Sequence, residues 1–201
     1  MLIVLDILGT LAFAITGASK AIQYKLDWLG LLVLTVITGT GGGILRDVFL
    51  GMTPPLAFQK PIYVIVCFFG AILTLVAKEK IHAHWNYVLV VDALGLGFFT
   101  AVSANRACLI EGADINILVI IFSAVITAVG GGVIRDLIVR EIPFILKQDF
   151  YASAAILGAL VYIALRFAGI GSPTFQLFAT TIFTFLVRLF AMKWRFHLPN
   201  T

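Results

Sequence analysis

The sequence contains the same pattern of apolar segments twice, and this duplication restricts the possible folds more than any other feature. DILGTLAFAITGASKA, which begins at Asp6, aligns with DALGLGFFTAVSANRA, which begins at Asp92. GGGILRD from Gly41 aligns with GGGVIRD from Gly130. Each copy contains three apolar segments, an odd number, so the second copy must enter a membrane from the opposite side. We therefore expect an inverted repeat, an arrangement typical of transport folds.

The composition requires a membrane, because a domain of 201 residues that is 61% hydrophobic and only 12% charged could not bury so much apolar surface in water. A membrane-spanning helix needs about 20 mostly apolar residues. We predict an all-α membrane protein with seven such helices, at residues 2–22, 28–50, 59–77, 86–107, 115–139, 149–168 and 174–192. They form a single transmembrane domain, 1–201, in which repeat 1 covers about 2–77, repeat 2 about 86–168, and helix seven about 174–192.

The distribution of basic residues predicts the orientation. Lys and Arg collect on the cytoplasmic side of membrane proteins. Ten of the fourteen fall on one side of the predicted topology, namely Lys20, Lys25, Lys78, Lys80, Arg135, Arg140, Lys147, Arg188, Lys193 and Arg195. We therefore expect a multi-pass protein of the cell membrane with its N-terminus outside and its C-terminus in the cytoplasm. Because this rule accounts for the basic residues, we expect no nucleic-acid partner.

Two glycine triplets lie deep inside predicted helices, Gly41, Gly42 and Gly43 in the second and Gly130, Gly131 and Gly132 in the fifth. Each glycine costs roughly 1 kcal/mol in a helix interior relative to alanine. We predict a kink or local unwinding at both triplets, and a pore or transport site there, since broken backbone in a membrane lies inside protein or beside water. The alternative is close helix packing, for which the G-x-x-x-G of Gly39 and Gly43 is a typical motif.

Charged residues inside the predicted helices form two groups, and such residues in membranes are usually functional. The predicted topology places Asp6, Arg46, Asp47 and Arg106 near the outer mouth, and Lys20, Asp92, Arg135 and Asp136 near the inner mouth. Each group has two acids and two bases and can neutralise itself. Sequence neighbours such as Arg46 and Asp47 point about 100° apart on a helix, so we expect each to find partners on other helices, for example Asp6 for Arg46. One hypothesis is that these groups gate or filter ions, and the alternative is that they form a static network that joins the helices. Lys20 and Arg106 are the candidates for a gating charge that moves in the membrane potential.

Small hydroxyl side chains mark a polar path suited to a hydrated monovalent cation. We predict as pore-lining residues Thr16, Ser19, Thr38, Ser123 and Thr127. Each could instead bond to its own helix backbone. His82 and His84 have no further ligands nearby, so we predict no metal site and no cofactor. The predicted helices contain no Ser-His-Asp or metal set, and Asp47 and Asp136 would lie near opposite faces, so we do not expect an enzyme.

The duplicated three-helix unit, the doubled GGG-x-x-R-D motif and the extra seventh helix together resemble the prokaryotic branch of the trimeric intracellular cation (TRIC) channels, a group that overlaps glycine-transporter-like membrane proteins. The resemblance covers nearly the whole chain. It implies a homotrimer with one pore in each subunit between helices 1, 2, 4 and 5. That pore would pass potassium and, to a lesser degree, sodium. We expect membrane lipids as further partners, with lipid as a candidate bound molecule.

Two functions remain open from the sequence. The first is a monovalent cation channel, for which we expect Gly42→Leu or Gly131→Leu to abolish flux without affecting assembly. The second is a secondary transporter of glycine or another small amino acid, because the N-termini of broken helices can bind a carboxylate. Both kinds of protein use inverted repeats, so the sequence separates them weakly.

Overall fold

The structure is a computed structural model that describes residues 1–79, 85–111, 116–147 and 150–194. Within these ranges all regular structure is helical. In the described part of the chain, five helices are long and apolar enough to cross a membrane: α1 (Leu2–Gln23), α2 (Trp28–Phe49), α6 (Asn86–Glu111), α7 (Ile117–Ile138) and α10 (Pro173–Trp194). They coincide with five of the predicted segments. The other two predicted segments correspond to shorter apolar helices, α4 (Ile62–Val76) and α9 (Ala152–Phe167).

Two four-residue helices that the sequence pattern did not predict lie in the loops that follow α2 and α7. They are α3 (Leu56–Gln59) and α8 (Phe144–Lys147). Each follows a proline, Pro55 and Pro143, whose fixed φ favours the start of a helical turn. A four-residue turn is too short to show a hydrophobic period, so hydropathy does not reveal it.

Side-chain caps fix the starts of α2 and α7, the two helices that carry the glycine triplets. The Asp27 Oδ1 atom accepts a hydrogen bond of 2.7 Å from the Gly30 amide at the start of α2. Asn116 Oδ1 accepts one of 3.0 Å from the Leu118 amide at the start of α7. Such bonds satisfy backbone donors that the first helical turn leaves free.

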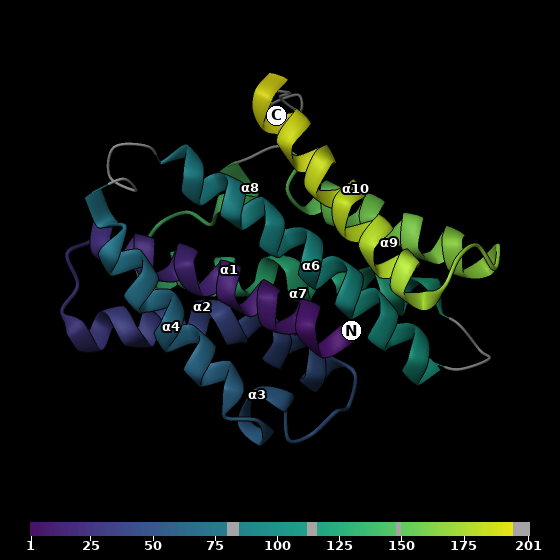
Figure 1. The fold of residues 1–201 in the computed structure, drawn as a ribbon, viewed down its shortest axis with the longest axis horizontal. Helices are drawn as coiled ribbons and strands as arrows, with labels where there is room; N and C mark the ends of the chain where they lie inside the picture. The colour runs from purple at the N-terminus through teal and green to yellow at the C-terminus, as the bar shows by residue number, and fades with distance from the viewer. Residues whose placement is uncertain (80–84, 112–115, 148–149, 195–201) are drawn as a thin grey trace.

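Helices α1, α2, α6 and α7 form the centre of the molecule, where α1 packs against α2 and α6, and α7 packs against α2 and α6. Helix α4 covers α1 and α2 on one flank, and α9 and α10 cover α6 on the other (Figure 1). Helix α9 also contacts α7. The two copies of the repeat thus contribute equivalent pairs, α1 with α2 and α6 with α7, to one four-helix centre.

Packing at this centre depends on small residues, while large apolar side chains point outward. Fully buried positions are often alanines, such as Ala14, Ala104 and Ala128. Large exposed side chains include Phe69, Ile72, Phe122, Leu157, Ile182 and Leu186. Small residues let helices approach closely in a membrane, and an apolar exterior suits lipid. The distribution is therefore that of a protein whose surrounding solvent is hydrocarbon.

Candidate functional site

Helices α2 and α7 cross at the two glycine triplets, where their backbones are in direct contact. A Cβ atom added to Gly42 would lie 2.1 Å from the carbonyl oxygen of Thr127, and one added to Gly131 would lie 2.2 Å from that of Thr38. No side chain fits at such a separation. The central glycine of each triplet is therefore required by the close approach of the opposite helix.

Of the predicted kink or local unwinding, the unwinding is wrong, because α2 and α7 are continuous α-helices through both triplets, and the kink stays a prediction. The weak helix propensity of glycine is a small cost, and close packing between the helices overrides it. The geometry argues against the expectation that Gly42→Leu or Gly131→Leu would leave assembly intact, since either leucine would meet the backbone of the opposite helix. Gly42 and Gly131 therefore pack closely against the opposite helix, as in the packing alternative, and their place in a pore stays a prediction.

The other glycines of the triplets have different surroundings. A Cβ on Gly41 would contact Ile134 Cδ1 at 3.3 Å, and one on Gly130 would lie 2.7 Å from Leu45 Cδ1. At Gly43 the nearest atom would be Arg46 Nη2, and at Gly132 it would be Arg135 Nη2, both at 3.7 Å. The third glycine of each triplet thus leaves space beside an arginine. The predicted packing motif holds only for its first member, Gly39, whose Cβ would lie 2.8 Å from Cys67 Sγ.

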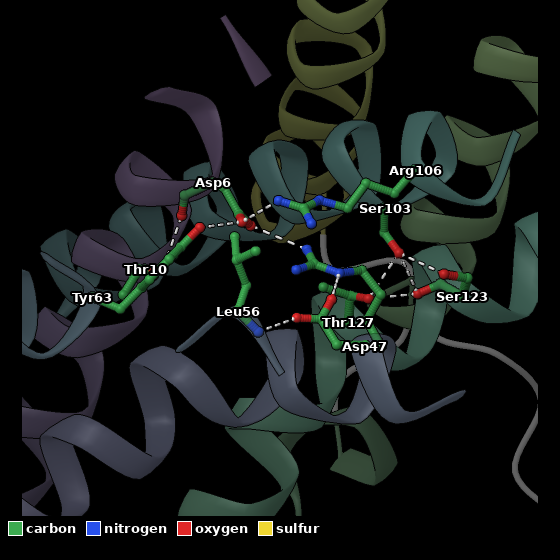
Figure 2. A network of polar contacts seen from close by, with 10 residues as sticks. Asp6, Thr10, Asp47, Leu56, Tyr63, Ser103, Arg106, Ser123 and Thr127 are labelled. Carbon is green, nitrogen blue, oxygen red and sulfur yellow. Dashed lines mark hydrogen bonds and ion pairs between the residues drawn. The ribbon is translucent and has the colours of Figure 1, made fainter. Parts of the chain in front are cut away.

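At one end of the crossing lies a buried network that we call the Asp6 cluster, made of Asp6, Arg46, Asp47, Tyr63 and Arg106. Arg46 Nη1 donates to Asp6 Oδ1 at 3.1 Å, as predicted. Asp6 Oδ2 accepts from Arg106 Nη2 at 3.1 Å and from the Tyr63 hydroxyl at 2.7 Å (Figure 2). A single carboxylate therefore joins α1, α2, α4 and α6.

Asp47 and Asp136 each pair with the arginine that precedes them, although we expected these residues to find their partners on other helices. Arg46 Nε donates to Asp47 Oδ1, and Arg135 Nε donates to Asp136 Oδ1, both at 2.8 Å. The long arginine side chain bends back, so the 100° between adjacent positions is no obstacle. The second oxygen of each aspartate accepts a backbone amide at 2.8 Å, that of Leu56 at the start of α3 and that of Phe144 at the start of α8.

The other end of the crossing holds the equivalent Asp92 cluster, made of Asp92, Arg135, Asp136 and Tyr151. The Tyr151 hydroxyl donates to Asp92 Oδ2 at 2.7 Å, as Tyr63 does to Asp6. Arg135 Nη1 lies 3.6 Å from Asp92 Oδ1 and donates to Thr16 Oγ1 at 3.0 Å. The ion pair is longer than its counterpart at Asp6 because Arg135 is shared with the hydroxyl on α1.

Lys20 does not join the Asp92 cluster, although it is the counterpart of Arg106 in the repeat. Its Nζ lies 2.8 Å from Glu141 Oε2, in the loop after α7. The prediction that Lys20 completes a self-neutralising set with Asp92, Arg135 and Asp136 is therefore wrong. Glu141 also accepts a hydrogen bond from the Tyr24 hydroxyl. Partial burial of the Glu141 carboxylate raises its pKa, but the hydrogen bonds from Lys20 and Tyr24 outweigh this effect. The pKa of Glu141 is therefore lowered overall.

Four of the five predicted pore-lining hydroxyls, all except that of Ser123, donate to backbone carbonyls of their own helices. The acceptors are Phe13 for Thr16, Ile15 for Ser19, Leu34 for Thr38 and Ser123 for Thr127, at 2.6 to 2.9 Å. Ser103 Oγ on α6 lies 2.8 Å from the carbonyl and hydroxyl oxygens of Ser123 and from Thr127 Oγ1 (Figure 2). Ser123 and Thr127 share a face as predicted, and that face contacts α6.

The two clusters differ in the space beside them. A cavity of about 250 Å³ lies at the Asp92 cluster, and its lining includes Thr16, Lys20, Trp85, Asp92, Arg135 and Glu141. The space at the Asp6 cluster is about 10 Å³, close to the size of one water molecule. A path between the helices would therefore be open at the Asp92 end and filled by side chains at the Asp6 end.

Several residues of the site were not identified from the sequence. Tyr63, Tyr151 and Glu141 each contact a charged residue of the predicted groups. The two tyrosines lie within one residue of matching positions in the repeat, a signal that could have identified them. Glu141 has no counterpart, since Met52 stands at the matching position. No group of three metal-binding side chains occurs in the described residues, and His82 and His84 lie outside them.

Comparison with known proteins places this geometry in a family. The family model described as "Glycine transporter" matches residues 3–79 and 89–166, one match for each copy of the repeat. The inner membrane protein YadS of Escherichia coli (strain K12) is 36% identical over 198 residues, which cover 98% of this chain and 94% of YadS. A membrane protein of Vibrio cholerae is also 36% identical, over 100% of this chain and 82% of its own length.

Solved TRIC structures superpose on nearly the whole chain. The TRIC trimeric intracellular cation channel orthologue from Rhodobacter sphaeroides has a TM-score of 0.89 and 34% identity, with 97% of this chain and 98% of that chain covered. A prokaryotic TRIC channel crystallised in 0.5 M KCl has a TM-score of 0.87 and 31% sequence identity, with 98% of both chains covered. The chain is therefore an all-helical membrane protein that belongs to the prokaryotic TRIC channel family, the group that the glycine-transporter family model also describes.

Proposed function

We propose that this protein is a monovalent cation channel with one pore in each subunit, between α1, α2, α6 and α7. The observation that carries the proposal is the arrangement of two equivalent buried ion-pair clusters on either side of the α2–α7 glycine crossing, with a polar cavity at one of them. The similarity to proteins described as TRIC cation channels supports it. The same similarity supports a role other than that of an enzyme.

The proposed membrane topology has seven spans, formed by α1, α2, α4, α6, α7, α9 and α10, as two inverted three-helix repeats and a seventh helix in a single domain. The matching bonds of Tyr63 to Asp6 and of Tyr151 to Asp92 support the repeat. The basic residues support an N-terminus outside and a C-terminus in the cytoplasm. In that orientation the Asp92 cavity faces the cytoplasm and the Asp6 cluster faces outward.

Conduction in this proposal runs from the cytoplasmic cavity past the glycine crossing to the Asp6 cluster. Asp92, Asp136 and Glu141 supply carboxylates to the cavity lining, which favour cations over anions. The Asp6 cluster would form the closed gate. Arg106 is its most loosely held cation, since it makes one ion pair to Asp6 and its buried Nε has no hydrogen-bond partner among the described residues. Its movement away from Asp6 would open the narrow end.

The proposal further includes a homotrimer in the cell membrane, with lipid between the subunits and with potassium and sodium as the permeant ions. The relative from Rhodobacter sphaeroides, whose structure is described as trimeric, supports self-association. The apolar outward faces of α4, α9 and α10 supply surface for both subunit and lipid contacts.

A cysteine-modification experiment tests the route of the ions. In a background with Cys67→Ala and Cys108→Ala, the Leu89→Cys variant places a thiol in the cavity lining. A charged thiosulfonate reagent applied from the cytoplasmic side should reduce the potassium flux of reconstituted liposomes. Val33→Cys, on the exposed apolar face of α2, is the matched control, and the reagent should not change its potassium flux. Equal flux before and after modification of Leu89→Cys would contradict this route.

Secondary transport of glycine or another small amino acid is the second candidate function. The cavity brings together carboxylates and the cations Lys20 and Arg135, a mixture that could bind a zwitterion. Counterflow of labelled glycine in the same liposomes separates the two functions. Saturable counterflow without an electrical current would favour the transporter, and potassium current without counterflow would favour the channel.

A further inference from the structure

The Lys20 ammonium group lies in a small aromatic site whose parts come from three separate segments. Its Nζ is 5.7 Å from the centre of the Tyr24 ring and 5.7 Å from the centre of the Trp85 ring. Glu141 Oε2 lies 2.8 Å from the same atom. Two aromatic faces within about 6 Å of a cation, together with a carboxylate, form the type of site that binds ammonium groups.

The repeat does not explain why Lys20 occupies this site. Arg106, its counterpart in the other copy, pairs with the Asp6 carboxylate at 3.1 Å. By the same relationship Lys20 would pair with Asp92, which lines the same cavity. Lys20 instead contacts Glu141. Neither Glu141 nor Tyr24 belongs to the Asp6 cluster or the Asp92 cluster. The Glu141 carboxylate and the two aromatic rings together hold Lys20 in this departure from the repeat.

The site is accessible from the cavity. Lys20, Trp85 and Glu141 all line the space of about 250 Å³. The side chain of Glu141 is 27% exposed and Tyr24 is 39% exposed, so solutes can reach the carboxylate and the phenol ring. The cavity has room for several water molecules, and hence for a small organic cation.

We propose that Tyr24, Trp85 and Glu141 form a receptor for primary or quaternary ammonium groups at the mouth of the cavity, and that Lys20 is its built-in ligand in this state. Lys20 can move to Asp92 and pair with it in the way that Arg106 pairs with Asp6 in the other copy. The receptor is then free for an external ammonium compound. Such a compound competes with Lys20 and stabilises the arrangement in which Lys20 is withdrawn. The chemistry fits a soluble amine or the headgroup of an amine-bearing lipid equally well.

Calorimetric titration of the purified protein with choline tests this proposal without any measurement of conduction. Lys20→Met removes the built-in ammonium and keeps an apolar side chain. We expect choline to bind Lys20→Met saturably and at least about tenfold more tightly than it binds the wild type, a difference that calorimetry resolves. The neutral isostere 3,3-dimethylbutan-1-ol should not bind saturably, because it has the same shape and no charge.

The double variant Lys20→Met with Trp85→Leu is the matched control and should lose this affinity. The proposal is wrong if choline fails to bind Lys20→Met, if it binds wild type and Lys20→Met equally, if the isostere binds as well as choline, or if Trp85→Leu has no effect. Gel filtration confirms that each variant is folded, and Lys20→Gln replaces Lys20→Met if the latter aggregates.

Nanodiscs distinguish the two sources of the ammonium group. Lys20→Met is titrated with choline in discs of phosphatidylglycerol alone and in discs that also contain phosphatidylethanolamine. A weaker apparent affinity in the mixed discs means that the lipid headgroup occupies the receptor, and an unchanged affinity means that the ligand is a soluble amine. Both results support the receptor; absence of choline binding in the phosphatidylglycerol discs contradicts it.

Discussion

Gly42 of α2 faces the main chain of Thr127 on α7 so closely that a single methyl group at Gly42 would lie 2.1 Å from the Thr127 carbonyl oxygen. The reciprocal contact between Gly131 and Thr38 has the same geometry. The central glycines therefore set the distance between the helices that carry Arg46 and Arg135, one arginine of each ion-pair cluster. An added side chain would separate the helices and displace both clusters together.

Alanine substitutions within one triplet should have opposite effects. Gly42→Ala forces the helices apart and should destabilise the protein by roughly 1–3 kcal/mol, the usual cost of overpacking. Gly43→Ala has its nearest neighbour at 3.7 Å, so it should be neutral or stabilising by up to about 1 kcal/mol from helix propensity. Thermal unfolding of both variants in the same detergent measures the difference. Equal melting temperatures would contradict the packing role of Gly42.

Loss of the Asp6 carboxylate should be among the most damaging single changes in the chain. Asp6→Ala leaves the buried guanidinium of Arg106 without an acidic partner and removes one of the two carboxylates of Arg46. Breaking a buried pair in this way costs roughly 3–5 kcal/mol. Asp27→Asn is the control, because asparagine also caps a helix and the residue is exposed. A similar unfolding temperature for the two variants would show that the cluster does not hold the helices together.

The Lys20–Glu141 pair should make stability depend on pH in the acid range. The pKa of Glu141 is lowered from its ordinary value of 4.5, so the folded state binds the proton less readily than the unfolded state. The ionised Glu141 carboxylate therefore makes its full contribution to the free energy of unfolding above pH 4.5. This contribution is lost as the pH falls through the lower pKa that Glu141 has in the folded state.

Unfolding of wild type and Glu141→Gln across the range from pH 7 to about pH 3 measures this effect. Glutamine keeps the shape of the side chain and removes its charge. Wild type should be the more stable at pH 7, and the difference should shrink below pH 4.5. A difference that stays constant with pH would mean that the charge of Glu141 contributes nothing.

The sequence predicted those parts of the molecule that the internal repeat and the hydropathy pattern determine. Long apolar segments became helices close to the expected positions, since about 20 apolar residues in a membrane have few alternatives to a helix. The pairing of Arg46 with Asp6 was predictable because a buried charge requires an opposite charge on a neighbouring helix.

Other features depend on contacts that no sequence period records. Glu141 lies in a loop, 121 residues from Lys20, and its position has no acidic counterpart in the first copy. The bend of Arg46 back to Asp47 is a matter of side-chain rotamer, which helical spacing does not determine. The glycine triplets favoured a kink at a pore over close packing, and only the position of the opposite helix showed the close packing at Gly42 and Gly131.

Planar-bilayer recording of the purified wild-type protein under a tenfold gradient of potassium chloride tests cation conduction directly. A cation channel should give unitary currents that reverse near the potassium equilibrium potential, which is about 59 mV in magnitude for a monovalent ion. Reversal near the chloride potential, of opposite sign, would contradict cation selectivity. Absence of unitary currents, together with saturable glycine counterflow in liposomes of the same preparation, would contradict the channel itself.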